Sequence, residues 1–536
     1  MEKKWIAGLV LIVLVFATAW FWLASSLTGW SDEITHMSVA QGLIKTGTYS
    51  YIDFDSGKVS DYYPSGLYTR GKLISLMTSL SYQLFGFSLL SARSVPLIFT
   101  VLIFLVFATY IKMRYKSGWR NIFFVSIFFF CQSMVLEKSL YVRMYAPLGL
   151  ILMISLIFYW EGLGFWERGK KSEGAGFMAV AFFLTLLPVL DTWHYQQISI
   201  FFVAVIAGFF VKNRGFVEKI LKHRMKSIIG AVVCCILFPF ILLIFNVVIS
   251  RLPVGNRIMG NSFITYWDNI AGLVRFALAA NICLLGFFLP HRDMKYPAQA
   301  FVEWLFIIGL VSGLFTALYT PHNFIFYSRF FYLPILLLVL SFPIILSGSL
   351  KRGKSVKIAI ASYVAINIAL SFSNFYFERS NIRKPISWLV SNLGKEEVLL
   401  VFASELQLHG GGGLSLRAIS VPASKKPEDI KKVIAILTES GKGDVYFLYT
   451  DHYAFRDTLY HFTSGRNRSP GADLFRFLRD DLNGVSVMSG LRGCGLKRFG
   501  RDRLKNDLQE LVNRGYPDQF ISPEVSFLRN LKRTIK

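Results

Sequence analysis

Two adjacent acidic residues, Asp32 and Glu33, stand directly after the first long apolar run of the sequence. A carboxylate at a membrane surface can accept the proton of an attacking hydroxyl, which is general base catalysis. The same two acids could instead begin a helix over residues 34–44, because the helix dipole favours negative charge at that end. The pair alone leaves both interpretations open.

Further polar residues stand at the ends of apolar runs, mostly on the side of the membrane where Asp32 emerges. Arginine can bind a phosphate through two parallel hydrogen bonds, so arginines near a carboxylate fit transfer from a lipid phosphate. Ordinary roles stay open as well: Arg93 and Arg329 could be interface anchors, and His194 could belong to an aromatic belt. The candidate binding residues are Arg70, Arg93, Arg143, Tyr145, His194, Tyr195 and Arg329.

The composition indicates a membrane protein. Of the 536 residues 54% are hydrophobic, and they occur in blocks that approach the roughly 20 residues of a membrane-spanning helix. Many of the basic residues behind the net charge of +25 stand in short loops between these blocks. Such residues set topology, so we expect no nucleic-acid partner. The five cysteines form no disulfide framework and no zinc-ligand pairs, so we expect no structural metal.

Basic loops also predict the orientation of the chain. Clusters of lysine and arginine alternate along the sequence with loops that carry far fewer bases, and the positive-inside rule places the clusters and the N-terminus in the cytoplasm. About eleven crossings follow, with the C-terminal part outside the cytoplasm and the protein in the plasma or inner membrane. The predicted spans are 5–25, 94–111, 121–137, 144–160, 175–190, 197–211, 228–249, 269–289, 300–318, 330–347 and 356–373.

One apolar segment, residues 72–86, does not fit this alternation. If it crossed the membrane, every later basic cluster would move to the outer side, against the charge bias. Its leucines recur at helical spacing with serines between them, which predicts an amphipathic helix in the outer interface. The alternative is a twelfth crossing.

The composition becomes charged and mixed after residue 373. Alternating segments at 396–404, 443–450 and 485–490 predict strands, and residues 427–440 and 502–513 predict helices. We therefore predict an all-α polytopic membrane bundle over residues 1–373, with about eleven transmembrane helices plus interfacial helices. A small C-terminal α/β extracytoplasmic domain over residues 374–536 would follow.

Five short motifs occur in an order that resembles a known class of enzymes. They are SDEITHMSVAQGLIKTG (31–47), SYQLFGFSLLSARSVPLIF (81–99), SLYVRMYAPLGL (139–150), DTWHYQQ (191–197) and YSRFFYLPILLL (327–338). The order resembles the polytopic lipid-phosphate-sugar glycosyltransferases of the GT-C class. Within that class it is most similar to the dolichyl-phosphate-mannose protein mannosyltransferases and the bacterial lipid A aminoarabinose transferase. The resemblance covers roughly residues 1–345.

The resemblance implies a sugar transfer from a polyprenyl-phosphate donor to a hydroxyl of a glycan, lipid or protein, with inversion. It implies that Asp32 is the general base and that Glu33 positions the acceptor or Asp32. Arg93 and Arg329 would bind the lipid phosphate, with the remaining candidates lining the pocket. The sequence departs from some relatives because no aspartate follows Arg143 within a few residues. Some members use a divalent metal, which His36 and His194 could ligate, but others need none and we expect no cofactor.

Other function classes fit this sequence less well. A transporter or a lipid or glycan flippase also needs many helices, but it usually carries charges and broken helices near the membrane midplane. Here the charges gather at one face, which favours an interfacial enzyme. A polymerase or ligase of lipid-linked glycans would lack the early pair of acids. A non-catalytic scaffold would be supported by an Asp32→Ala variant that changes nothing.

Overall fold

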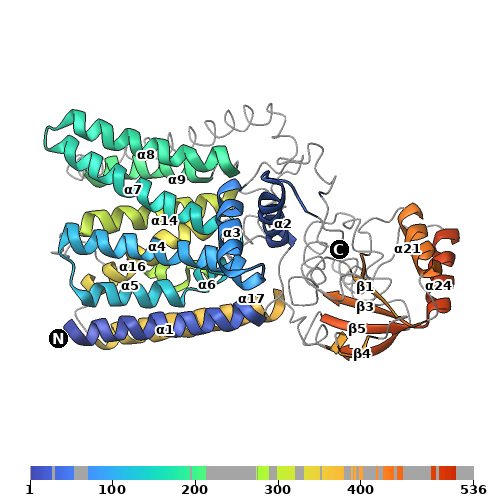
Figure 1. Ribbon diagram of the computed structural model, residues 1–536. Coiled ribbons are helices and arrows are strands. Elements are labelled where there is room, and N and C mark those ends of the chain that lie inside the picture. The colour runs from blue at the N-terminus through green and yellow to red at the C-terminus, as the bar shows by residue number, and fades with distance from the viewer. Residues whose placement is uncertain are drawn as a thin grey trace, which may run out of the picture. The chain divides into compact units, whose positions relative to one another are not determined.

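A computed structural model of the chain describes helices over most of the N-terminal three quarters and a small sheet near the C-terminus (Figure 1). The described residues are 2–26, 31–52, 59, 71–192, 196–212, 273, 276–288, 298–319, 331–349, 353–378, 388–389, 391–393, 397–401, 418–420, 427–439, 443–450, 484–489 and 494–514.

The chain divides into two compact units, each assembled from segments that are distant in sequence. The first unit comprises Met1–Thr18, Pro96–Ser139 and Met144–Ala369, and the second comprises Ala19–Val95, Leu140–Arg143 and Leu370–Lys536. The predicted domain boundary between residues 373 and 374 stays a prediction.

Most helices of the first unit are runs of leucine, isoleucine, valine and phenylalanine. Such segments form helices in a bilayer because each backbone polar group is then bonded within its own segment. Helix α16 has its side chains buried from Tyr332 to Leu346 and packs against α5 and α14. The helices that contribute to this unit are α1 (Glu2–Ser26), α4 (Leu89–Tyr115), α5 (Trp119–Cys131), α6 (Ser133–Ser139), α7 (Tyr145–Glu167), α8 (Lys171–Thr192), α9 (Gln196–Lys212), η1 (Asn281–Phe288), α14 (Gln299–Tyr319), α16 (Tyr332–Ser349) and α17 (Gly353–Glu378).

Four described helices, α1, α4, α7 and α14, are long and apolar enough to cross a membrane, and the α5–α6 pair makes a fifth if it counts as one span. The predicted span over 228–249 and the beginning of that over 269–289 lie outside the described residues. The total of about eleven crossings and the side of each terminus therefore stay predictions.

The predicted crossing over residues 121–137 is divided in the structure, because α5 and α6 meet at Gln132 with a bend of 68°. Gln132 donates from its side-chain amide to the Ala279 carbonyl at 2.8 Å and accepts the Ser133 N–H at 3.0 Å. The Asn367 side chain accepts the same N–H at 3.1 Å. Inserted polar side chains are a known cause of helix breaks, and here two of them accept the Ser133 N–H at the start of α6.

Helices α2 (Ser31–Thr46) and α3 (Lys72–Phe85) belong to the second unit. The predicted helices over 34–44 and 72–86 are thus confirmed. On α3 the serines and Thr78 are buried, whereas Leu76, Leu80, Leu84 and Phe85 are exposed. The 14 residues of α3 reach about 21 Å, which is short of the roughly 30 Å hydrocarbon core. Both facts favour an interfacial helix over a twelfth crossing.

The C-terminal part of the second unit contains a five-stranded mixed sheet of order β2-β1-β3-β5-β4. Strands β2, β1 and β3 are parallel, and β5 is antiparallel to both β3 and β4. A register shift between Ser486 and Met488 marks a bulge in the outer strand β4. The strands are β1 (Val398–Val401), β2 (Ala418–Ser420), β3 (Val445–Thr450), β4 (Val485–Ser489) and β5 (Cys494–Phe499).

The two faces of this sheet bury alternate residues, as period-two patterning requires. Leu400 and Phe447 pack with the apolar faces of α21 (Pro427–Glu439) and α24 (Arg501–Arg514), which lie together on one side of the sheet in Figure 1. Leu399 and its neighbours cover the other face with Leu389. The three predicted strands and two predicted helices are confirmed, and β2 and β5 are additional. A separate domain outside the cytoplasm stays a prediction.

Candidate functional site

Helix α2, which carries the early acids, is fixed by the segment that follows it. The Ser38 hydroxyl donates to the Ile52 carbonyl at 2.5 Å and accepts the Ile52 N–H at 2.8 Å. One turn later, a Cβ atom on Gly42 would lie only 1.9 Å from the Ser50 carbonyl oxygen. A residue without a side chain is therefore required at position 42, and the close approach locks residues 50–52 onto the helix.

The carboxylate of Glu33 forms a buried ion pair with Arg93. Arg93 Nη2 lies 3.1 Å from Glu33 Oε2, and Arg93 Nε lies 3.3 Å from Glu33 Oε1. Both side chains have no exposed surface. This fork-to-fork geometry is the strong form of an arginine–carboxylate contact, and full burial makes each charge dependent on the other.

Two further segments of the same unit meet at this pair. Arg93 Nη1 donates to the Ala24 carbonyl in the last turn of α1 at 3.0 Å, and the Val142 backbone N–H donates to Glu33 Oε1 at 3.2 Å. A cation is favourable at that end of a helix because the last carbonyls have no partner within it. One ion pair thus ties together the end of α1, the start of α2, the start of α4 and the loop at 140–143.

These bonds give Arg93 acceptors inside the protein at Nε, Nη1 and Nη2. They also occupy both carboxylate oxygens of Glu33. This geometry suits a positioning role for Glu33 and Arg93, in which the pair holds the neighbouring segments in place. The predicted contact of Arg93 with a lipid phosphate stays a prediction.

Asp32 lies in the first turn of α2, next to Glu33 and one turn before His36 in the helix. The structure describes the backbone of Asp32 but not its side chain. His36 is buried and its Nδ1 lies 3.3 Å from Ser75 Oγ on α3. Gly71 has a φ of 65°, and a Cβ atom there would lie 2.5 Å from His36 Cε1. Left-handed backbone at Gly71 therefore allows the start of α3 to close against this turn of α2.

Tyr82 on α3 is a member of this site that the sequence analysis missed. Its hydroxyl is buried, and no residue within the described ranges hydrogen-bonds to it. Burial, and to a smaller extent the charge of Glu33, raise the pKa of Tyr82 well above its usual value. The hydroxyl therefore stays protonated and keeps a donor available. The sequence signal that could have identified Tyr82 is a tyrosine among the serines of the predicted amphipathic helix.

The first unit holds a second buried pair of charges just before the R-x-Y motif. Lys138 Nζ lies 2.5 Å from Glu137 Oε1 on α6, and the same ammonium lies 5.6 Å from the centre of the Tyr145 ring. The other carboxylate oxygen, Glu137 Oε2, is buried and accepts no hydrogen bond from the described residues. Glu137 is not among the predicted site residues, because a second acid was expected only after Arg143, which is half-buried in the loop before α7.

Several predicted site residues lie outside the described ranges: Arg70, His194, Tyr195 and Arg329. Their roles stay predictions. Within the part of the chain that the structure describes, no three histidine, cysteine, aspartate or glutamate side chains gather where they could hold a metal ion.

Comparison with known proteins adds a likeness of fold. No family model matches the sequence, and no curated protein matches it significantly. Among solved structures, ArnT from Cupriavidus metallidurans in the apo state is 12% identical, with a TM-score of 0.48 over 92% of this chain and 98% of that one. ArnT bound to undecaprenyl phosphate is 13% identical, with a TM-score of 0.50 over 93% of this chain and 98% of that one.

The chain has an ArnT-like fold. ArnT is a GT-C lipid A aminoarabinose transferase, so the resemblance that the motif order indicated is confirmed at the level of the fold. At this low identity the likeness to ArnT transfers no residue roles, which have to be argued from the site itself.

Proposed function

We propose that this chain is an integral-membrane glycosyltransferase that moves a sugar from a polyprenyl-phosphate carrier to an acceptor hydroxyl on the extracytoplasmic face. The observation that carries the proposal is the buried pair of Glu33 and Arg93, which fixes the first turn of α2 where Asp32 stands. The fold supports it, because the ArnT structure of that fold binds a polyprenyl phosphate. The apolar helices fit the plasma or inner membrane.

In this proposal Asp32 is the general base and Glu33 is a positioning residue. Glu33 is a poor base because both of its oxygens already accept hydrogen bonds from Arg93 and one also accepts the Val142 N–H. Asp32 removes the proton of the acceptor hydroxyl, and the oxygen attacks the anomeric carbon. The bond from that carbon to the phosphate oxygen breaks on the opposite side, so the configuration inverts.

The leaving lipid phosphate gains negative charge as that bond breaks, and fixed donors around it stabilise the transition state. We assign this role to Arg70, Arg143 and Arg329, with Tyr145, His194 and Tyr195 lining the donor pocket. Arg93, which is already bonded to Glu33, contributes its positive charge to this stabilisation. The chemistry needs no nucleotide, because the activated donor supplies the energy.

The test is sugar transfer by the purified full chain in lipid nanodiscs, with radiolabelled polyprenyl-phosphate sugars and a membrane extract as the source of acceptor. Asp32→Asn should lower the rate about 10²–10⁴-fold, the usual contribution of a general base. Lys45→Gln, an exposed position on the same helix, is the matched control and should transfer like wild type. Equal transfer by Asp32→Asn and wild type would remove Asp32 from the mechanism.

A lipid or glycan flippase is the second candidate, favoured by one observation. The α5–α6 break carries a buried pair of opposite charges, Glu137 and Lys138, and broken helices with buried charges are typical of transporters. A fluorescent polyprenyl-phosphate sugar in sealed vesicles separates the two functions. Movement between leaflets without label transfer to any acceptor would support the flippase and contradict the transferase.

A further inference from the structure

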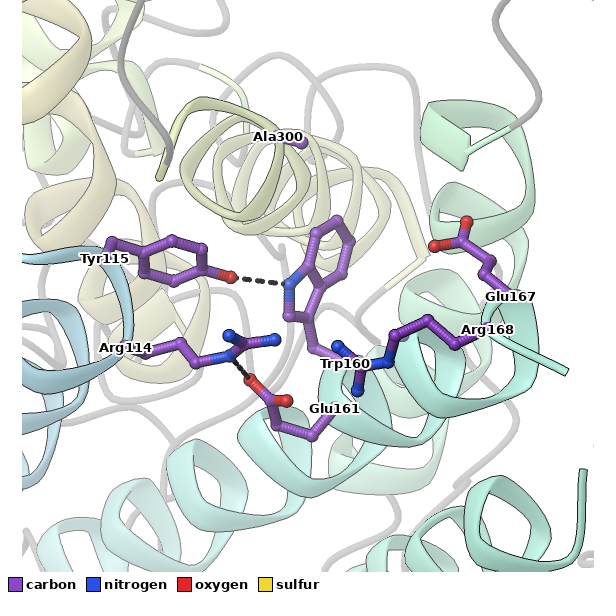
Figure 2. Close-up of a pocket in the computed structure, with 8 residues that line it drawn as sticks. Arg114, Tyr115, Trp160, Glu161, Glu167, Arg168 and Ala300 are labelled. Atoms are coloured by element: carbon purple, nitrogen blue, oxygen red, sulfur yellow. Dashed lines mark hydrogen bonds and ion pairs between the residues drawn. The ribbon is translucent and has the colours of Figure 1, made fainter. Parts of the chain in front are cut away.

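A pocket in the first unit lies where α4 and α7 end and α14 begins (Figure 2). Its volume is about 240 Å³. Its lining combines charged and aromatic side chains: Arg114, Tyr115, Trp160, Glu161, Gly164, Glu167, Arg168 and Ala300. None of these residues belongs to the site proposed for sugar transfer.

One wall of this pocket is held rigid by a chain of hydrogen bonds. Arg114 Nε and the Tyr110 hydroxyl both donate to Glu161 Oε1, each at 2.7 Å. Beside them, Trp160 Nε1 donates to the Tyr115 hydroxyl at 2.8 Å. The charge of Arg114 is therefore balanced and its guanidinium is aimed before any ligand arrives.

The opposite wall carries a second arginine, Arg168. Arg168 contacts the ring of Phe165 at 4.7 Å, and no carboxylate within the described ranges forms an ion pair with it. Figure 2 shows the guanidiniums of Arg168 and Arg114 pointing toward the same space from opposite sides, with the Trp160 ring beside them. Of the two convergent guanidiniums, only that of Arg114 forms an ion pair within the described ranges, and such a pair of arginines favours a ligand with negative charge.

The surroundings of the pocket indicate that this ligand comes from the bilayer. Met113 and Trp166, the neighbours of Arg114 and Glu167, are 76% and 47% exposed. Exposed apolar and tryptophan side chains at the ends of apolar helices are typical of headgroup depth. Lys112, Lys116, Lys170 and Lys171 add positive charge at the same helix ends, and such charge attracts acidic lipids.

We propose that this pocket binds the phosphodiester headgroup of an anionic phospholipid between Arg168 and Arg114. The bound lipid bridges α4 and α7 at the end where the basic loops predict the cytoplasmic leaflet. It contributes to the stability of the bundle and takes no part in sugar transfer. The proposal therefore does not depend on the proposed enzyme activity, and its test measures binding only.

The test titrates the purified full chain in detergent with phosphatidylglycerol or phosphatidylcholine and counts bound lipids by native mass spectrometry. Arg168→Gln keeps a polar side chain but removes the charge. Arg168→Lys keeps the charge but removes the planar guanidinium, which can donate two parallel hydrogen bonds to a phosphate. The side chain of Arg168 is exposed, so neither change should unfold the protein. Arg120→Gln, at another exposed base near the same helix ends, is the matched control.

We expect phosphatidylglycerol to bind about tenfold more weakly to Arg168→Gln, as the loss of one hydrogen-bonded charge implies. Arg168→Lys should be intermediate and Arg120→Gln unchanged. Equal binding of phosphatidylcholine would overturn the requirement for a net negative lipid. An equal loss in Arg120→Gln would show diffuse attraction without a site. Displacement of the lipid by inorganic phosphate at the same concentration would show a site for the free anion and would also overturn the proposal.

Discussion

Replacement of Arg93 by methionine should destabilise the protein far more than the loss of a surface charge. Methionine retains much of the arginine volume, so the main effect is electrostatic. The change removes the hydrogen bonds to both oxygens of Glu33 and to the Ala24 carbonyl. It leaves an ionised carboxylate with no exposed surface, which has lost its bonds to the guanidinium and keeps the bond from the Val142 N–H. Removal of one partner from such a pair costs about 3–5 kcal/mol of unfolding free energy.

That cost corresponds to about two to nearly four orders of magnitude in the folding equilibrium. Unfolding of the purified chain in mixed micelles, followed by tryptophan fluorescence, measures it for wild type, Arg93→Met, Glu33→Gln and the double variant. The double variant buries no charge, so it should recover most of the loss of Arg93→Met. Lys45→Met, at an exposed position on α2, is the control and should change little.

The reasoning would be refuted if Arg93→Met lost no more stability than Lys45→Met. It would also fail if the double variant were as unstable as Arg93→Met, because the loss would then come from packing and not from an uncompensated charge. If the double variant is stable, its transfer activity shows separately whether the pair is needed beyond holding α2.

Three further changes test other contacts. Gly71→Ala places a Cβ atom 2.5 Å from the His36 ring at a φ of 65°, so it should lower the melting temperature more than Gly86→Ala does. Gly86 is the control because its φ is 79° but no atom lies within 4 Å of the added Cβ. Equal losses of thermal stability would contradict the packing argument. Glu137→Gln removes the negative charge of the buried ion pair with Lys138 and should lower the free energy of unfolding by about 3–5 kcal/mol. A change no larger than that of a surface variant would mean that water screens the pair. Leu400→Ala empties a buried position of the C-terminal sheet and should cost about 2–5 kcal/mol, and unaltered amide exchange in β1 and β3 would argue against this core.

The sequence was sufficient to predict those elements whose patterns are local. Long apolar runs predicted α1, α4 and α14 to within five residues and α7 except for its last seven, and alternation predicted β1, β3 and β4. Strand β2 was missed because three residues are too few to show a period. Strand β5 was missed because Lys497 and Arg498 interrupt its apolar residues.

The site could be predicted only as a set of residue types. Glu33 and Arg93 were both expected at the outer face, but 60 residues separate them, and their mutual pairing depends on how α2 and α4 pack. The break at Gln132 has a similar origin. Gln132 is neither proline nor glycine, and its neighbour Ser133 is also bonded to Asn367, which is 234 residues away. Contacts of this range leave no trace in a single sequence.

The irregular outer strands of the C-terminal sheet have a consequence for how the protein behaves when crowded. Strand β2 offers three residues for pairing, and the bulge in β4 interrupts the row of amides and carbonyls on the far side. Within the described residues, neither edge strand is long or straight enough for a strand of a second molecule to extend the sheet. Many copies could therefore sit close together on one bilayer without joining sheet to sheet into fibrils.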